Sequence, residues 1–97
     1  IKQFSDHPDL RVMREPEDAT SNYWLNTLIL EPHAAFSRDA ILQRLNDAGF
    51  MARPVWEPMH TLGIYADAPR ARLPQTEALA QRIINLPSSA KLVELLP

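Results

Sequence analysis

The sequence predicts a small two-layer α+β domain, in which a short, mostly antiparallel sheet carries helices on one face. Its 97 residues are enough for a single domain. Apolar side chains make up 45% of it, which is ordinary for a globular protein with a core. Segments typical of strands and helices follow each other in the order strand, strand, helix, strand, long loop, helix and tail. This order favours a sheet with its helices on one side.

The first two strands are expected in the N-terminal third of the chain. Residues 10–13, LRVM, can form a short strand between loops that contain Pro8 and Pro16. Residues 22–30, NYWLNTLIL, predict a longer strand because they are rich in aromatic, aliphatic and threonine side chains. Both alternating faces of this strand are largely apolar, so it should be covered on both sides and end at Pro32.

Residues 37–49, SRDAILQRLNDAG, predict the first helix. Ser37 is expected to cap its N terminus, and Gly49 is expected to close its C terminus. The spacing of its apolar residues predicts one buried stripe, formed by Ile41, Leu45 and Ala48.

The second half of the chain predicts a strand, a long loop and a second helix. Residues 50–55, FMARPV, are expected to form the strand, and residues 57–73 the loop, with one helical turn near Pro58. A loop of this length is unusual in a compact domain unless it has a function. The helix should start at Pro74 or Thr76, bury Leu79 and Ile83, and stop at Pro87. The apolar tail KLVELLP fits no single element.

Composition argues against several classes of function. The net charge of −2 comes without any basic run, so nucleic-acid binding is not expected. No apolar stretch is long enough for a membrane span, and without cysteine there is neither a disulfide framework nor a zinc–thiolate site. The absence of cysteine suits a cytoplasmic location. Two glycines exclude a glycine-rich phosphate loop.

Histidines and lysines give no catalytic or metal-binding cluster in the sequence. His7, His33 and His60 are scattered, so no metal site is predicted. Lys2 and Lys91 are the only lysines, and both lie near the chain ends, where an amine is poorly placed for Schiff-base chemistry. No catalytic residue is therefore assigned.

The segment RPVWEPMH, residues 53–60, is the strongest candidate for a binding site. Pro54 and Pro58 fix the backbone, and groups that bind ligands lie between and just beyond them. Such a loop suits an anionic or hydroxyl-rich ligand. The candidate substrate-binding residues are Arg53, Trp56, His60 and Tyr65. Plain packing is the competing interpretation of Trp56 and Tyr65.

Four stretches resemble one known family when they are taken together: SNYWLNTLIL, RDAILQRLNDAGF, ARPVWEPMHTL and LPQTEALAQRIINLPSS. In this order and spacing they resemble the C-terminal part of the DegT/DnrJ/EryC1/StrS family, whose members are aminotransferases that use pyridoxal phosphate and act on nucleotide-linked keto-sugars. The resemblance covers about residues 10–92. It is nearest to the legionaminic-acid and bacillosamine branch.

The resemblance implies a two-domain parent with the fold of type I aminotransferases. In that family a large N-terminal domain holds the cofactor and its lysine, and a small C-terminal α+β domain packs beside it. Residues 1–97 would be this small domain, taken from a longer chain because the sequence begins at Ile1 rather than Met. Pyridoxal phosphate would then belong to the homodimeric parent and not to this chain, which alone should be inactive.

The resemblance also implies a substrate and roles for the candidate residues. The branch transfers an amino group to C4 of a UDP-linked 4-keto-6-deoxy-N-acetylhexosamine, with glutamate as the expected donor, for polysaccharide or glycan biosynthesis. His60 matches a histidine placed to contact this substrate. Arg53 would pair with a carboxylate or the diphosphate, and Trp56 would line the sugar pocket, although a structural role stays open for both. The rival interpretations are a stand-alone small-molecule-binding or regulatory module and a protein interaction domain.

Overall fold

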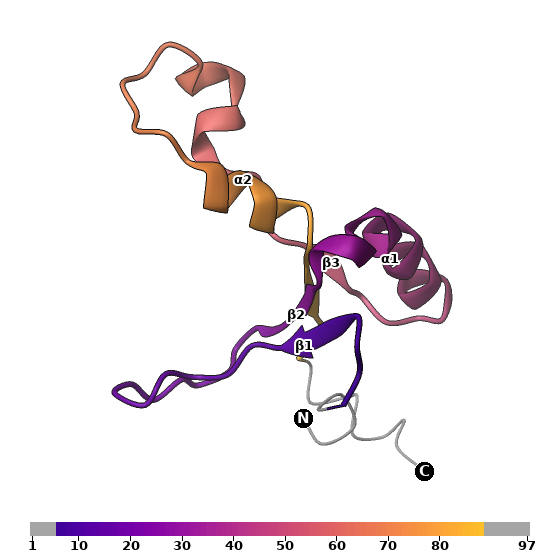
Figure 1. Ribbon diagram of the computed structural model, residues 1–97. Helices are drawn as coiled ribbons and strands as arrows, with labels where there is room; N and C mark the ends of the chain where they lie inside the picture. The colour runs from indigo at the N-terminus through magenta and orange to yellow at the C-terminus, as the bar shows by residue number, and fades with distance from the viewer. Residues whose placement is uncertain (1–5, 89–97) are drawn as a thin grey trace.

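The protein is built around a four-stranded antiparallel sheet with the strand order β1-β2-β4-β3 (Figure 1). The computed structural model describes residues 6–88. The strands are β1 (Leu10–Val12), β2 (Asn26–Leu30), β3 (Arg53–Pro54) and β4 (Ile83–Leu86). The α-helices are α1 (Arg38–Asp47) and α2 (Pro74–Ala80). Three 3₁₀ helices join them: η2 (Pro32–Ser37), η3 (Met59–Thr61) and η4 (Gly63–Tyr65).

The core lies between α1 and one face of the sheet. Leu28 of β2 is opposite Val12 on one side and Ile84 on the other, so these three side chains share a face. Leu28 and Ile84 pack with Ala52, and α1 adds Ile41, Leu42 and Leu45 to this cluster. A sheet with a helix on one face is the predicted α+β architecture, which is confirmed.

The strand β4 corrects the sequence prediction, which placed residues 83–86 in the second helix. The helix α2 begins at Pro74, as predicted, but it ends at Ala80. After a turn at residues 81–82 the chain enters β4, which lies inside the sheet between β2 and β3. Leu79 and Ile83 are four residues apart, which is the spacing of apolar residues on one face of a helix, and this spacing led to the wrong prediction. The β-branched pair Ile83 and Ile84 instead packs as part of a strand.

The second predicted strand is shorter than expected, because residues 22–25 do not join the sheet. Tyr23 has a φ of 49°, which is in the left-handed region. The side chain of Ser21 accepts the Tyr23 N–H, and that of Asn22 accepts the Trp24 N–H. These local hydrogen bonds favour a turn over a ladder. Within β2, however, residues 28–30 are buried, as expected for a strand covered on both sides.

The first helix agrees with the prediction in its position but not at its N terminus. Ser37 makes no side-chain cap, because η2 runs directly into α1. Gly49 has a φ of 93°, as a closing glycine needs. Ile41 and Leu45 are half-buried, but Ala48 is exposed and no residue of α1 is fully buried. The predicted stripe therefore packs through two of its three members.

The third strand and the long loop also differ from the prediction in extent. The predicted strand over residues 50–55 is reduced to the two residues of β3, an edge strand. Pro54 is tolerated there because an edge strand does not use every backbone N–H. The loop over residues 57–73 contains two short 3₁₀ helices rather than one helical turn.

Much of the large apolar surface of the chain is uncovered. The exposed large apolar side chains are Met13, Trp24, Leu25, Phe36, Met51, Trp56, Met59, Ile64 and Tyr65. Surface of this kind typically marks contact with another protein unit.

We expect the backbone amides of residues 57–73 to exchange with solvent faster than those of β2 and β4. The backbone–backbone hydrogen bonds inside the loop span only three residues, as from Thr61 N–H to the Pro58 carbonyl, so each can open locally. The β2–β4 ladder instead surrounds the buried Ile84. Hydrogen exchange of the isolated chain, read by mass spectrometry, would check this. Equal protection of the loop and the ladder would contradict it.

Candidate functional site

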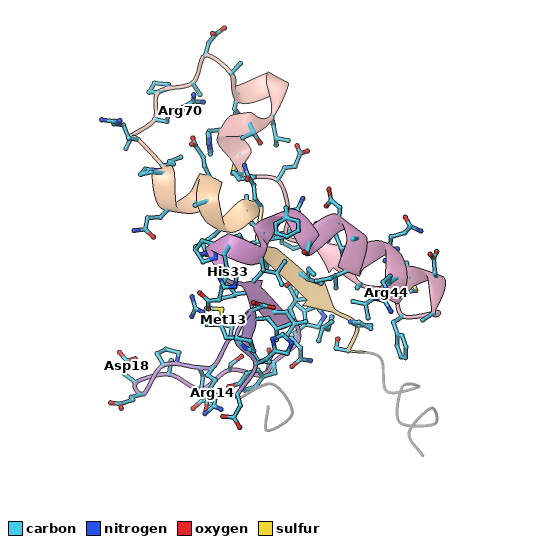
Figure 2. All side chains as sticks on the ribbon, turned by 45° about the vertical axis from the view of Figure 1, so that its right-hand side comes forward. Met13, Arg14, Asp18, His33, Arg44 and Arg70 are labelled. Atoms are coloured by element: carbon cyan, nitrogen blue, oxygen red, sulfur yellow. The ribbon has the colours of Figure 1, made fainter. Side chains whose placement is uncertain are left out.

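The candidate site lies in the long loop between β3 and α2, which projects away from the sheet together with α2 (Figure 1). Figure 2 shows Arg70 of this loop far from Asp18, which lies at the end of the β1–β2 connection, and from Arg44 on α1. Two 3₁₀ turns fold the first half of the loop, and the second half returns to Pro74. The first half of the loop therefore faces the second half and the first turn of α2.

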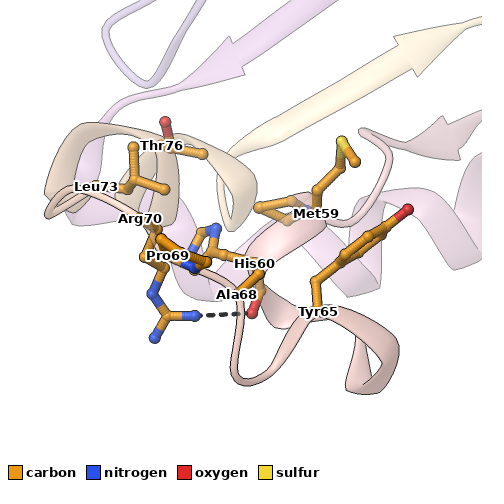
Figure 3. A pocket seen from close by; sticks show the side chains of 9 residues that line it. Met59, His60, Tyr65, Ala68, Pro69, Arg70, Leu73 and Thr76 are labelled. Carbon is orange, nitrogen blue, oxygen red and sulfur yellow. Dashed lines mark hydrogen bonds between the residues drawn. The ribbon is translucent and has the colours of Figure 1, made fainter.

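A pocket of about 340 Å³ opens between the two halves of this loop (Figure 3). His60 and Tyr65 line it from the first half, and Arg70 and Leu73 line it from the second. Thr76 of α2 completes the wall, together with Met59 and several small or proline residues. The wall is therefore largely apolar with a few polar groups, which is the usual make-up of a small-molecule pocket.

His60 is held in place by two contacts. Its Nε2 lies 3.1 Å from Oε1 of Glu77 on α2, and its side chain is only 10% exposed. Its backbone carbonyl accepts a hydrogen bond of 3.0 Å from Nη1 of Arg70 (Figure 3). The imidazole is therefore fixed at the wall of the pocket rather than free in solvent.

Arg53 has partners elsewhere. Its Nη1 donates to Oδ1 of Asn46 and to the Ala52 carbonyl, both at 2.9 Å. Asn46 in turn donates to the Leu42 and Ala52 carbonyls. This network joins the C-terminal turn of α1 to β3. In this structure Arg53 thus has structural partners, and it does not line the pocket of His60.

Trp56 also lies apart from the pocket. Its side chain is 78% exposed, and it is not among the residues that line the cavity. Of the four predicted site residues, the structure therefore brings together His60 and Tyr65 and leaves Arg53 and Trp56 outside.

Sequence reasoning missed Glu77, Arg70 and Asn46. Glu77 is 17 positions from His60, and Arg70 is 10 positions from it. No periodicity connects these positions, because the path of the loop decides which residues meet. The acidic residue in the first turn of α2 was visible in the sequence, but there it reads simply as a favourable helix terminus.

The described residues supply neither a lysine nor a cluster of metal-ligating side chains. Residues 6–88 contain no lysine, since Lys2 and Lys91 lie outside the described residues, so this part of the chain offers no amine for pyridoxal phosphate. Over the same residues no three histidine or acidic side chains are arranged to hold a metal ion. Between residues 6 and 88 no helix is both long and apolar enough to cross a membrane.

Comparison with known proteins gives one consistent family. Residues 1–94 match the model of the DegT/DnrJ/EryC1/StrS aminotransferase family. GDP-perosamine synthase from Vibrio cholerae is 31% identical over 80 residues, covering 81% of this chain and 22% of that protein. The putative pyridoxal phosphate-dependent aminotransferase EpsN from Bacillus subtilis (strain 168) is 36% identical over 89 residues, or 88% of this chain and 22% of that protein. This chain thus spans about a fifth of the length of these curated relatives.

The fold is also shared with a solved structure. DesI, solved in the presence of its TDP-sugar product, superposes with a TM-score of 0.77 at 27% identity, over 90% of this chain and 23% of that chain. The sequence resemblance, the family match and the fold agree. The chain therefore belongs to the DegT/DnrJ/EryC1/StrS aminotransferase family.

Proposed function

We propose that this chain is the small C-terminal domain of a pyridoxal phosphate-dependent aminotransferase that acts on a nucleotide-linked keto-sugar. The observation that carries the proposal is the pocket in which His60 is held beside Tyr65, within a chain that belongs to this family. Its apolar wall suits a sugar ring, and its few polar groups suit hydroxyls.

The names of the relatives support a nucleotide sugar as the class of substrate. One is a synthase of GDP-perosamine, and another was solved with a TDP-sugar. We take the substrate of this chain to be a UDP-linked 4-keto-6-deoxy-N-acetylhexosamine and the donor to be glutamate, following the branch that its motifs resemble. The reaction would serve the synthesis of surface polysaccharide or another glycan in the cytoplasm.

The cofactor is assigned to a preceding N-terminal domain. Because residues 6–88 include no lysine, they do not fit a covalent pyridoxal phosphate site. The cofactor, where it is bound, carries the amino group between donor and acceptor. The part of this chain is to bind the sugar at the His60 pocket and to help exclude water from it.

The uncovered apolar surface supports this division into domains. Trp56, Met59 and Ile64 are exposed close to the pocket loop, and Trp24 and Leu25 are exposed near β2. Moving one such side chain from water into a buried site is favourable by about 1.5–3 kcal/mol. We therefore expect the N-terminal domain, and the second subunit of a homodimer, to cover them.

Expression of the complete reading frame tests the proposal. The full-length protein should transfer the amino group of glutamate to the UDP-linked keto-sugar, while the 97-residue chain should not. With pyridoxal phosphate and borohydride, the full-length protein should be labelled at one lysine and the 97-residue chain should not be labelled stoichiometrically. Such labelling of the short chain at Lys2 or Lys91, or a reading frame without a cofactor domain, would overturn the assignment and favour a stand-alone binding or interaction module.

A further inference from the structure

A carboxylate outside the predicted site contacts its central residue. Oε1 of Glu77 lies 3.1 Å from Nε2 of His60, although the two residues come from η3 and α2. We propose that Glu77 is a positioning residue, which fixes the tautomer of His60 so that Nδ1 presents a hydrogen-bond acceptor to a hydroxyl of the sugar. This inference rests on the proposed function, because it deepens the role given to His60 there.

The chemistry of the pair determines the tautomer. An ionised carboxylate only accepts hydrogen bonds, so in this pair Nε2 carries the proton and donates a hydrogen bond to Glu77. In a neutral imidazole the other nitrogen is then an acceptor. The ring therefore suits a ligand group that donates, such as a hydroxyl, better than a phosphate oxygen.

The second ring nitrogen is free to receive such a group. Nδ1 of His60 has no hydrogen-bond partner among residues 6–88. It is not closed off from solvent either, since the buried, unpartnered side-chain nitrogen or oxygen in this part of the chain is Nε of Arg82. A bound hydroxyl requires an acceptor without a partner, and His60 is among the residues that line the pocket.

The backbone segments that carry the two residues are held by further hydrogen bonds, while the Glu77 side chain itself is 59% exposed. The η3 turn is closed by Oγ1 of Thr61, which donates to the Pro58 carbonyl at 2.7 Å. On the other side, the guanidinium of Arg38 donates to the Ala80 carbonyl at the end of α2. Glu77 thus places the imidazole relative to a helix that leads directly into the central strand β4.

The test uses the full-length enzyme and combines nitrogen-15 NMR with a double-mutant cycle. His60 should show the Nε2–H form in the unmodified protein, and Glu77→Ala should convert its signals toward an average of the two tautomers. In kinetics, Glu77→Ala should lower kcat/KM for the nucleotide sugar about two- to tenfold. The same change in a His60→Gln background should have less than a twofold effect, because the group that it positions is gone.

Asp67→Ala is the matched control. Asp67 is an exposed carboxylate in the loop that carries His60, and no salt bridge joins it to another residue between 6 and 88. Its removal should leave both the His60 signals and kcat/KM unchanged within a factor of two. The half-reaction with glutamate alone should also be unaffected by Glu77→Ala, since no sugar is bound in it.

The outcomes test the positioning role of Glu77 separately from the sugar-binding role of His60. A protein in which His60 carries its proton on Nδ1 overturns the role of Glu77 whatever the kinetics show. If Glu77→Ala lowers kcat/KM equally in the unmodified and the His60→Gln background, the role of Glu77 is to stabilise the fold of the loop. The same conclusion follows if the variant slows both half-reactions equally. If His60→Gln alone leaves kcat/KM unchanged, the sugar-binding role of His60 fails first, and the positioning role of Glu77 fails with it.

Discussion

Replacing His60 with glutamine in the full-length protein is expected to lower kcat/KM for the nucleotide sugar by about five- to 150-fold. The amide nitrogen of glutamine can still donate to Glu77, but its amide oxygen, the acceptor that remains, is not held at the position of the ring nitrogen Nδ1. A ligand hydroxyl then stays without a partner in the pocket, which costs about 1–3 kcal/mol. Steady-state kinetics with the UDP-linked keto-sugar would measure this loss, while the half-reaction with glutamate should be largely retained.

A second histidine provides a matched control for this variant. Nε2 of His33 lies 2.6 Å from Oδ1 of Asp9, so it forms the same kind of pair as His60 and Glu77. It lies next to β1 and does not line the pocket. His33→Gln should change kcat/KM by less than twofold, because exposed pairs contribute little.

Glutamine is a better replacement than alanine because of how His60 is packed. The side chain of His60 is only 10% exposed. Alanine would therefore open space beside α2 and mix a structural effect with a chemical one. Loss of the cofactor spectrum, or a large fall in melting temperature for His60→Gln, would make His60 a structural residue.

Replacing Ile84 with alanine is expected to lower the free energy of unfolding of the chain by about 2–5 kcal/mol. Ile84 is 0% exposed and lies in β4, opposite Leu28 of β2 and Pro54 of β3. The cavity would open where the sheet and α1 meet. Urea denaturation followed by circular dichroism would show a lower midpoint, and a domain of this size has only about 5–15 kcal/mol to lose.

The same substitution at the exposed Ile64 is a control, because it removes the same atoms from a side chain that is not buried. Ile64 is 82% exposed in the loop of the pocket, so Ile64→Ala should change the stability of the isolated chain by about 0.5 kcal/mol or less. Equal shifts of the denaturation midpoint for the two variants would mean that β4 is not the central strand of the core.

Local signals were sufficient to predict several elements. Gly49 and the spacing of Ile41 and Leu45 located α1, and Pro74 located the start of α2. The strand β4 could not be separated from a helix, because short apolar runs satisfy both periods. Ile84 of β4 pairs with Leu28, which lies far away along the chain. Pairing at that distance depends on tertiary packing, and local propensity carries no information about it.

The site was predictable to the extent that it lies within one segment. His60 and Tyr65 are close in sequence and line the same pocket, and of the two only His60 lies in the proline-braced run of residues 53–60. Glu77 and Arg70 reach His60 only because the loop turns back on itself through η3 and η4. Whether Arg53 and Trp56 contact the substrate stays a prediction, and Arg53→Lys in the full-length protein would address it through KM.

The central position of β4 has a consequence for how the chain matures during synthesis. β1 and β2 are the first pair of strands that can meet during synthesis, because they are consecutive in the sequence. β3 pairs only with β4, which is the last strand of the described chain, so it has no partner while translation passes through α2. During that interval the inner edge of β2, rich in leucine and isoleucine, remains open. A nascent chain stalled before residue 83 is thus the species most exposed to strand-mediated association and to capture by chaperones.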